Sequence, residues 1–115
     1  MATRTVFMPD HWKIRISVFG PDGRAKTGEP VSQDIAGPLC FAGDMTGTGR
    51  MLPLIEQGDY VVLHDTGAYY FSNPFYYNAL PAPAVYGAET DPGGSVKLDC
   101  WREQQSMDDM LAVIG

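Results

Sequence analysis

The stretch QGDYVVLHDTGAYYFS, residues 57–72, holds two runs rich in β-branched and aromatic side chains. The runs cover residues 60–64 and 68–72, and the polar residues 65–67 separate them. Val, Tyr and Phe favour the pleated surface of a strand, and a short polar connection that contains glycine favours a tight bend. The stretch therefore predicts two strands that are joined by a hairpin or a tight bend.

Three further segments show strand signals. Residues 12–19 (WKIRISVF) and 95–101 (SVKLDCW) alternate apolar and polar side chains, as strands with one solvated face do. By this alternation, Cys100 should point into the core. The GPDG turn at residues 20–23 ends the first segment, and a more polar strand is expected over residues 31–36.

Glycine and proline mark the irregular parts of the chain. Residues 43–49 hold three glycines and predict a loop. Pro53 argues against a central strand in the apolar run MLPLI, residues 51–55. Pro81 and Pro83 should stand at the entrance of a strand or on a sheet edge.

The end of the chain carries a helix signal. Ser106 is followed three residues later by Asp109, which approximates a capping box. We therefore expect one short C-terminal helix, with an apolar face formed by Met107, Met110, Leu111 and Ile114.

Composition favours a single globular domain. The chain has 115 residues, with 13 glycines, 9 prolines and 44% hydrophobic residues, a mixture that suits a turn-rich β fold. The formal net charge is -6 and the basic residues are scattered, which argues against nucleic acid as a partner.

No targeting, membrane or metal signal stands out. No stretch approaches the roughly 18 apolar residues of a membrane span, and residues 1–12 lack the apolar segment of a signal peptide. We therefore expect a protein that is not secreted, in the cytoplasm or an organelle. Cys40 and Cys100, with His11 and His64, form neither a disulfide framework nor a zinc-binding pattern, so both cysteines should be thiols.

Five motifs in one order carry a family resemblance. The chain resembles the C-terminal β-barrel domain of fold-type III pyridoxal-phosphate decarboxylases (group IV), which include the ornithine, diaminopimelate and arginine decarboxylases. The resemblance covers residues 12–101 and implies one mainly β domain over residues 1–115, a Greek-key-like barrel followed by the short helix. It rests on GPLC (37–40) with Asp44, LPLIEQGDYVV (52–62), DTGAYYFS (65–72), FYYN (75–78) and PAPAVY (81–86).

The resemblance assigns a catalytic role to Cys40. In the family, the cysteine of the Gly-Pro-x-Cys loop reaches across a dimer interface into the partner's active site. There its thiol donates a proton after carbon dioxide has left the substrate, chemistry that a thiol can perform. The residue type alone favours another interpretation, a small apolar side chain packed under a turn.

The GAY motif is the second candidate contact. By the same resemblance, Tyr69 donates a hydrogen bond to the cofactor phosphate, and Gly67 lets the backbone approach a ligand. A strand tyrosine packed in the barrel and a plain turn glycine are the structural alternatives. His64, just before this motif, is better explained as a polar residue at a strand end than as a catalytic base.

One departure from the family pattern concerns the substrate. The residue after the loop cysteine is commonly Asp or Glu, which binds the distal amine of the substrate, but here it is Phe41. Phe41 could favour an apolar or aromatic substrate side chain, or Asp44 or Asp65 could supply a carboxylate. Each aspartate could equally be a turn residue that bonds its own backbone.

The chain lacks the cofactor lysine of the family. In these enzymes the Schiff-base lysine and the glycine-rich phosphate segment lie on a separate (β/α)8 barrel domain, and none of Lys13, Lys26 and Lys97 stands in a matching context. We therefore expect a chain that is inactive alone and that completes the pyridoxal-phosphate site of a barrel partner, as a homo- or heterodimer. The alternatives are a regulatory binding module and a structural dimerisation domain.

Overall fold

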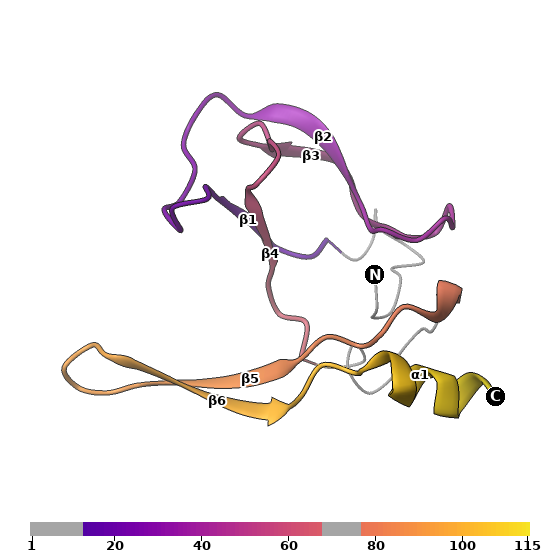
Figure 1. Cartoon of the computed structure of the whole chain (residues 1–115). Coiled ribbons are helices and arrows are strands. Elements are labelled where there is room, and N and C mark those ends of the chain that lie inside the picture. Colours follow the sequence, from indigo (N-terminus) through magenta and orange to yellow (C-terminus); the bar gives the residue numbers. More distant parts are fainter. Residues whose placement is uncertain (1–12, 68–76) are drawn as a thin grey trace. The chain divides into compact units, whose positions relative to one another are not determined.

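The computed structural model describes residues 13–67 and 77–115 (Figure 1). It contains two compact units, residues 3–73 and residues 74–115, which we call the first and the second unit. The described residues are mainly strands and turns, with one short α-helix at the C-terminus. This confirms the mainly β class and the closing helix. The strands form small sheets of two strands each, so a closed barrel stays a prediction, as does the single domain.

The first sheet of the first unit joins distant parts of the sequence. Strand β1 (Ile16–Phe19) pairs antiparallel with β4 (Tyr60–Leu63), with Ser17 opposite Val62. The apolar side chains that alternate along the first segment are buried, as predicted: Ile14 (5% exposed), Ile16 (8%) and Val18 (5%). Gly23 N donates to Gly20 O at 2.9 Å, which confirms the GPDG turn after β1.

The second sheet pairs β2 (Val31–Ala36) with β3 (Met45–Leu52). The bounds of β2 are the predicted ones, but the predicted loop over residues 43–49 is wrong, because β3 begins at Met45. Pairing with β2 overrides the turn preference of the glycines, and two shifts in register accommodate them. Pro53 lies just beyond β3, outside the sheet.

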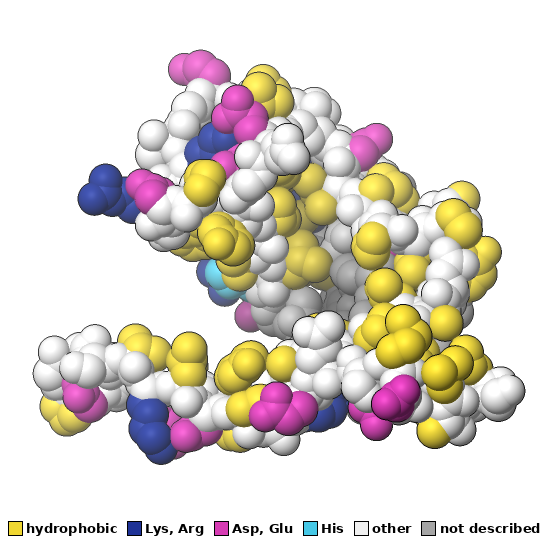
Figure 2. Space-filling view, in the orientation of Figure 1, with side chains coloured by type: hydrophobic (Ala, Val, Ile, Leu, Met, Phe, Trp, Pro, Cys, Tyr) yellow, Lys and Arg dark blue, Asp and Glu magenta, His cyan; other side chains and the backbone are white. Residues whose placement is uncertain are grey.

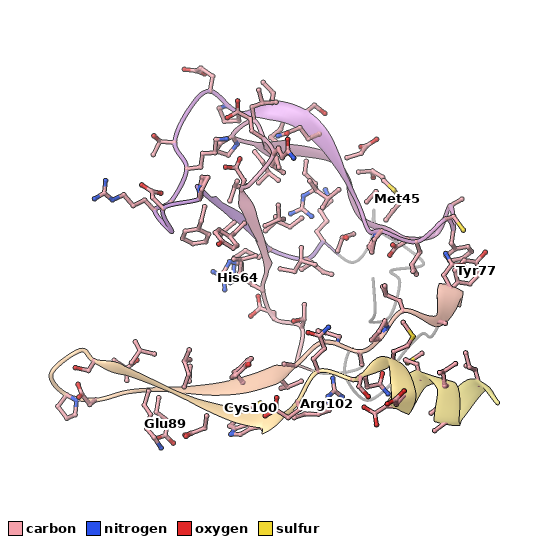
Figure 3. The ribbon with its side chains drawn as sticks, viewed as in Figure 1. Met45, His64, Tyr77, Glu89, Cys100 and Arg102 are labelled. Atoms are coloured by element: carbon pink, nitrogen blue, oxygen red, sulfur yellow. The ribbon has the colours of Figure 1, made fainter. Side chains whose placement is uncertain are left out.

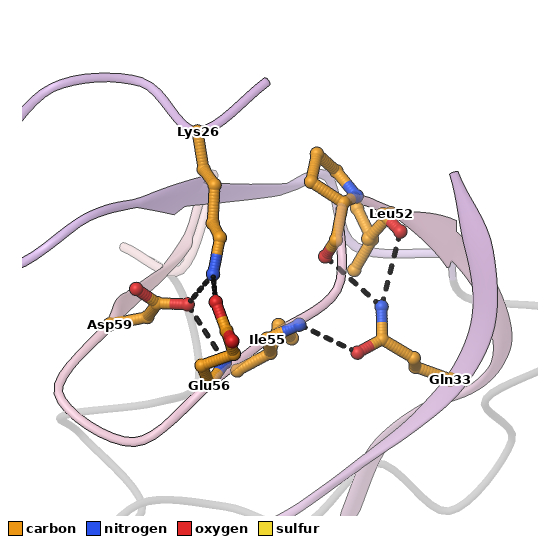
Figure 4. Close-up of polar contacts among 7 residues, drawn as sticks. Lys26, Gln33, Leu52, Ile55, Glu56 and Asp59 are labelled. Atoms are coloured by element: carbon orange, nitrogen blue, oxygen red, sulfur yellow. Dashed lines mark hydrogen bonds and ion pairs between the residues drawn. The ribbon is translucent and has the colours of Figure 1, made fainter. Parts of the chain in front are cut away.

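An ion-pair cluster fixes the turn that leads into β4 (Figure 4). Lys26 Nζ donates to Asp59 Oδ2 at 2.5 Å and to Glu56 Oε2 at 2.7 Å. The side chains of Lys26 and Asp59 are only 19% and 4% exposed. The hydrogen bond to Asp59 is the main cause that raises the pKa of Lys26, and the same bond lowers the pKa of Asp59.

Gln33 on β2 holds the start of the same turn. Its amide nitrogen donates to the carbonyl oxygens of Leu52 and Pro53, each at 3.1 Å, and its amide oxygen accepts Ile55 N at 2.9 Å. One side chain therefore satisfies several main-chain groups where β3 ends (Figure 4).

The second unit is a hairpin followed by a helix. Strands β5 (Val85–Thr90) and β6 (Val96–Arg102) pair antiparallel, and Pro81 and Pro83 precede β5 as predicted. A turn at Asp91 joins the strands, since Gly94 N donates to Asp91 O at 2.9 Å and Ser95 N donates to the Asp91 carboxylate at 2.8 Å.

The prediction that Cys100 points into the core is wrong, because its side chain is exposed. The period-2 pattern of β6 is real, but the apolar face that it creates is open to solvent in this unit. Cross-strand pairs place Tyr86, Ala88, Leu98 and Cys100 on that face. Tyr86, Leu98 and Val96 are 58%, 64% and 62% exposed. Hydrophobic side chains lie along this hairpin (Figure 2).

Helix α1 (Met107–Ile114) begins at the predicted capping box. Asp109 N donates to Ser106 Oγ at 3.1 Å, and the Asp109 carboxylate accepts Ser106 N at 2.8 Å. Of the predicted apolar face only Met110 is buried, whereas Leu111 is 54% exposed. Within the described ranges, no helix is long and apolar enough to span a membrane.

Candidate functional site

The cysteine motif forms a loop between β2 and β3 whose ends are bonded together. Gly37 N donates to Asp44 O at 2.7 Å, directly beyond the last β2–β3 pair, and Asp44 N donates to Phe41 O at 2.9 Å. The main chain of residues 37–44 is therefore closed by its own hydrogen bonds. We call this segment the cysteine loop.

The carboxylate of Asp44 lies inside the cysteine loop. Asp44 is 3% exposed, and its Oδ2 accepts the buried main-chain amide of Leu39 at 3.0 Å. This is the turn geometry that an aspartate at this position can form with its own backbone. A contact of Asp44 with the substrate stays a prediction.

Cys40 is exposed at the tip of the cysteine loop, between two anchored neighbours. Leu39 before it is 8% exposed, and Phe41 after it is half-buried. The interpretation in which Cys40 packs under the turn is therefore wrong. An exposed thiol with anchored neighbours is suited to proton transfer to a bound molecule, because its position is set before that molecule arrives.

The ring of Phe41 lies against Gly43. A Cβ atom at Gly43 would stand 2.6 Å from Cε1 of Phe41, so only glycine leaves room for the ring in this position. Phe41 thus covers part of the cysteine loop and places an apolar surface next to Cys40.

A second candidate segment follows β4 and contains a pair that the sequence did not reveal. His64 Nε2 lies 2.8 Å from Ser17 Oγ, and His64 N donates to Arg15 O at 2.9 Å. Ser17 is 47 positions away in the sequence, so only the β1–β4 pairing brings the two side chains together. The pair supports the view of His64 as a polar strand-end residue. Figure 3 labels Met45, where β3 begins directly after the cysteine loop, and His64, directly after β4.

Asp65 and Gly67 complete this segment. Asp65 has a φ of 58° and lies 3.6 Å from Arg15, in an ion pair whose side chains are 77% and 66% exposed. Such a pair contributes little to stability. Gly67 is exposed, and no described residue lies within 4 Å of a Cβ built on it. Tyr69 lies outside the described residues, so its phosphate contact stays a prediction.

The described lysines do not fit a Schiff-base site. The amine of Lys26 is held by two carboxylates that raise its pKa, which keeps it protonated and unable to attack an aldehyde. Lys13 and Lys97 are exposed, and Lys97 pairs with Asp99 at 3.0 Å. The protonated, paired amine of Lys26 is therefore unsuited to forming a Schiff base with pyridoxal phosphate. In the described parts of the chain, no group of three or more His, Cys, Asp or Glu residues could hold a metal ion.

Comparison with known proteins identifies the protein family of the chain. The family described as "Pyridoxal-dependent decarboxylase, C-terminal sheet domain" matches residues 3–67. The chain belongs to this family of pyridoxal-dependent decarboxylase sheet domains, as the resemblance implied.

Several proteins to which the chain is similar are diaminopimelate decarboxylases. The enzyme of Escherichia coli K12 is 37% identical over 107 residues, which cover 85% of this chain and 24% of the enzyme. The enzyme of Methanothermobacter thermautotrophicus is 36% identical over 68% of this chain. A crystal structure of a diaminopimelate decarboxylase matches 96% of this chain and 27% of that chain, with a TM-score of 0.75 and 31% identity. The chain thus spans about a quarter of the length of its relatives.

Proposed function

We propose that this chain is the sheet domain that completes the active site of a pyridoxal-phosphate-dependent amino-acid decarboxylase. The Schiff-base lysine and most of the cofactor contacts would come from a (β/α)8 barrel domain or chain, as a homo- or heterodimer. The family match and the lack of a suitable lysine among the described residues support this division of labour. The exposure of Cys40 at the tip of a closed loop is the single observation that carries the proposal.

Cys40 is the proton donor in this proposal. Pyridoxal phosphate, when bound to the barrel, withdraws electrons from the substrate carbon that loses carbon dioxide. The Cys40 thiol would donate its proton to that carbon and be left as a thiolate. The thiol stands at the tip of the cysteine loop, so another domain can reach it.

Gly67 and Tyr69 form the phosphate side of the proposed site. None of the described residues requires glycine at position 67. A close approach by the cofactor or by the barrel would explain the glycine, because a Cβ would then obstruct that approach. Tyr69, two residues further, would donate its phenolic hydrogen bond to the phosphate.

Phe41 sets the substrate class. The relatives named above act on diaminopimelate according to their names, but a phenyl ring lacks the carboxylate oxygens that form a charge-assisted hydrogen bond with a distal ammonium group. We infer a substrate with an apolar or aromatic side chain. The ring position against Gly43, next to the thiol, supports a wall of this kind at the site.

Reconstitution tests the proposal. This chain is mixed with a lysine-bearing barrel chain from the same source, and carbon dioxide release is measured with leucine, phenylalanine, diaminopimelate and ornithine. We expect activity only in the mixture and only with the apolar or aromatic substrates. Cys40→Ala should lower kcat by about a hundredfold, in the range lost when a general acid is removed.

Cys100→Ala is the matched control, because it removes the other exposed thiol. It should leave kcat unchanged. Full turnover by the Cys40→Ala mixture would exclude the proton-donor role. Inhibition of an intact family enzyme by this chain, without activity in any mixture, would instead favour the regulatory module.

A further inference from the structure

The cysteine loop is closed around one buried carboxylate. The Oδ2 atom of Asp44 accepts Leu39 N at 3.0 Å, and both groups are shielded from water, with Leu39 8% and Asp44 3% exposed. A hydrogen bond to a charged acceptor in such a place is stronger than one between neutral groups. It binds the residue that immediately precedes Cys40.

Gly37 shows independently that the loop is built for this carboxylate. A Cβ atom at Gly37 would overlap the carboxylate group of Asp44. The backbone of Gly37 and the side chain of Asp44 therefore fit together only because residue 37 has no side chain. The main-chain bond from Gly37 N to Asp44 O, at 2.7 Å, joins the same two residues.

We propose that Asp44 is a positioning residue that holds the main chain on both sides of Cys40 and acts on the reaction only through that loop. Its carboxylate fixes Leu39 N before the cysteine, and its own amide bonds Phe41 O after it. Asp44 thus sets where the thiol stands and does not bind the substrate amine. The effect of Asp44 on catalysis rests on the proposed function, in which Cys40 donates a proton. Its effect on the shape of the loop does not.

Hydrogen exchange of the Leu39 amide, followed by NMR on the full chain, tests the contact directly. Asp44→Ala leaves this amide without its acceptor, so its exchange should accelerate about ten- to hundredfold, as expected for loss of a bond to a charged group. Asp34→Ala is the matched control. Asp34 is an exposed aspartate of the same sheet whose carboxylate accepts Gly49 N at 2.8 Å. It should leave Leu39 exchange unchanged.

Asp44→Asn is the second variant. Its amide oxygen can still accept Leu39 N without the charge, so Leu39 exchange should be only about two- to tenfold faster than in the parent chain. This comparison carries the test if Asp44→Ala does not fold. Exchange in Asp44→Asn equal to the parent, or acceleration across the whole first unit, would overturn the proposal. The proposal would also be overturned if the Leu39 amide exchanged at the same rate in Asp44→Ala and in Asp34→Ala.

The reconstituted enzyme provides a second readout, the kinetic constants per folded chain, with the conservative Asp44→Asn variant as the rescue. Asp44→Ala should lower kcat at least tenfold with KM nearly unchanged, and Asp44→Asn should restore most of kcat. A rise in KM for the substrate with unchanged kcat would overturn the proposal, since it would mark a binding residue. An inactive parent mixture would remove the proposed function, while the Leu39 exchange result would still decide the role of Asp44.

Discussion

Ala79 holds a backbone conformation that alanine rarely adopts. Its φ is 52°, and the preceding residue, Asn78, has a φ of 60°. Asparagine tolerates the left-handed region because its short polar side chain can bond locally, whereas the Cβ of alanine approaches the following carbonyl oxygen. Two successive left-handed residues turn the chain within the short helix η1 (Tyr77–Ala79), ahead of β5.

Ala79→Gly should therefore stabilise the chain. Glycine enters the left-handed region without steric cost, and we expect a gain of about 1 kcal/mol in the free energy of unfolding, measured by urea denaturation. Ala84→Gly is the control, since Ala84 has no positive φ, and it should destabilise by about 0.5 kcal/mol. Equal effects of the two substitutions would contradict this interpretation.

Among the elements, the ion-pair cluster of Lys26, Glu56 and Asp59 joins the segment after β1 to the turn before β4. Its effect on stability depends on pH through two groups. Asp59, whose pKa is lowered from 3.8, contributes stability above pH 3.8 that is lost as the pH falls through its folded pKa. Lys26, whose pKa is raised from 10.5, contributes stability below pH 10.5 that is lost as the pH rises through its folded pKa.

Lys26→Met should reduce stability at neutral pH and flatten the loss of stability below pH 4. Thermal unfolding from pH 7 to pH 2.5, compared with the parent chain, checks both effects. Lys97→Met is the matched control, because the Lys97–Asp99 pair is far more exposed, at 71% and 44%. Parallel pH curves for Lys26→Met and the parent chain would show that the cluster adds no stability.

At the scale of the whole molecule, two features favour association with another chain or domain. These are the small size of the sheets and the exposed apolar surface of the β5–β6 hairpin. Two-stranded sheets alone are marginally stable, and each sheet of the described residues has two strands. The hairpin of β5 and β6 leaves Tyr86, Val96 and Leu98 mostly exposed. Such a surface promotes association.

Leu98→Thr should reduce the binding of a hydrophobic dye and the self-association of the chain. Threonine is β-branched and suits a strand, but it removes apolar surface from the open face of β6. Dye fluorescence and analytical ultracentrifugation measure the two effects. Lys97→Thr changes the adjacent residue on the opposite face and should alter neither. An unchanged dye signal in Leu98→Thr would show that this face of the hairpin is not the surface that binds the dye.

Local patterns predicted local structure well. The bounds of β2, the turn after β1 and the capping box of α1 were all visible in the sequence, because neighbouring residues determine them. The strand over Gly47 and Gly49 was missed because its pairing with β2 decides it. The Ser17–His64 contact was missed for the same reason.

Burial and the geometry of the candidate site were harder to predict. Alternation in β6 identifies two faces but cannot say which face is covered, so the orientation of Cys100 was wrong. For the cysteine loop, the residues of the motif are visible in the sequence, as is the choice between turn and substrate contact for Asp44. The fit of its carboxylate against Gly37 requires coordinates.

The self-contained bonding of the cysteine loop has a consequence for engineering. Gly37 and Asp44 fasten the segment at its base, so the tip residues Cys40 and Phe41 can be exchanged while the base is kept. The segment can then be transplanted between related sheet domains together with the two residues that hold its shape.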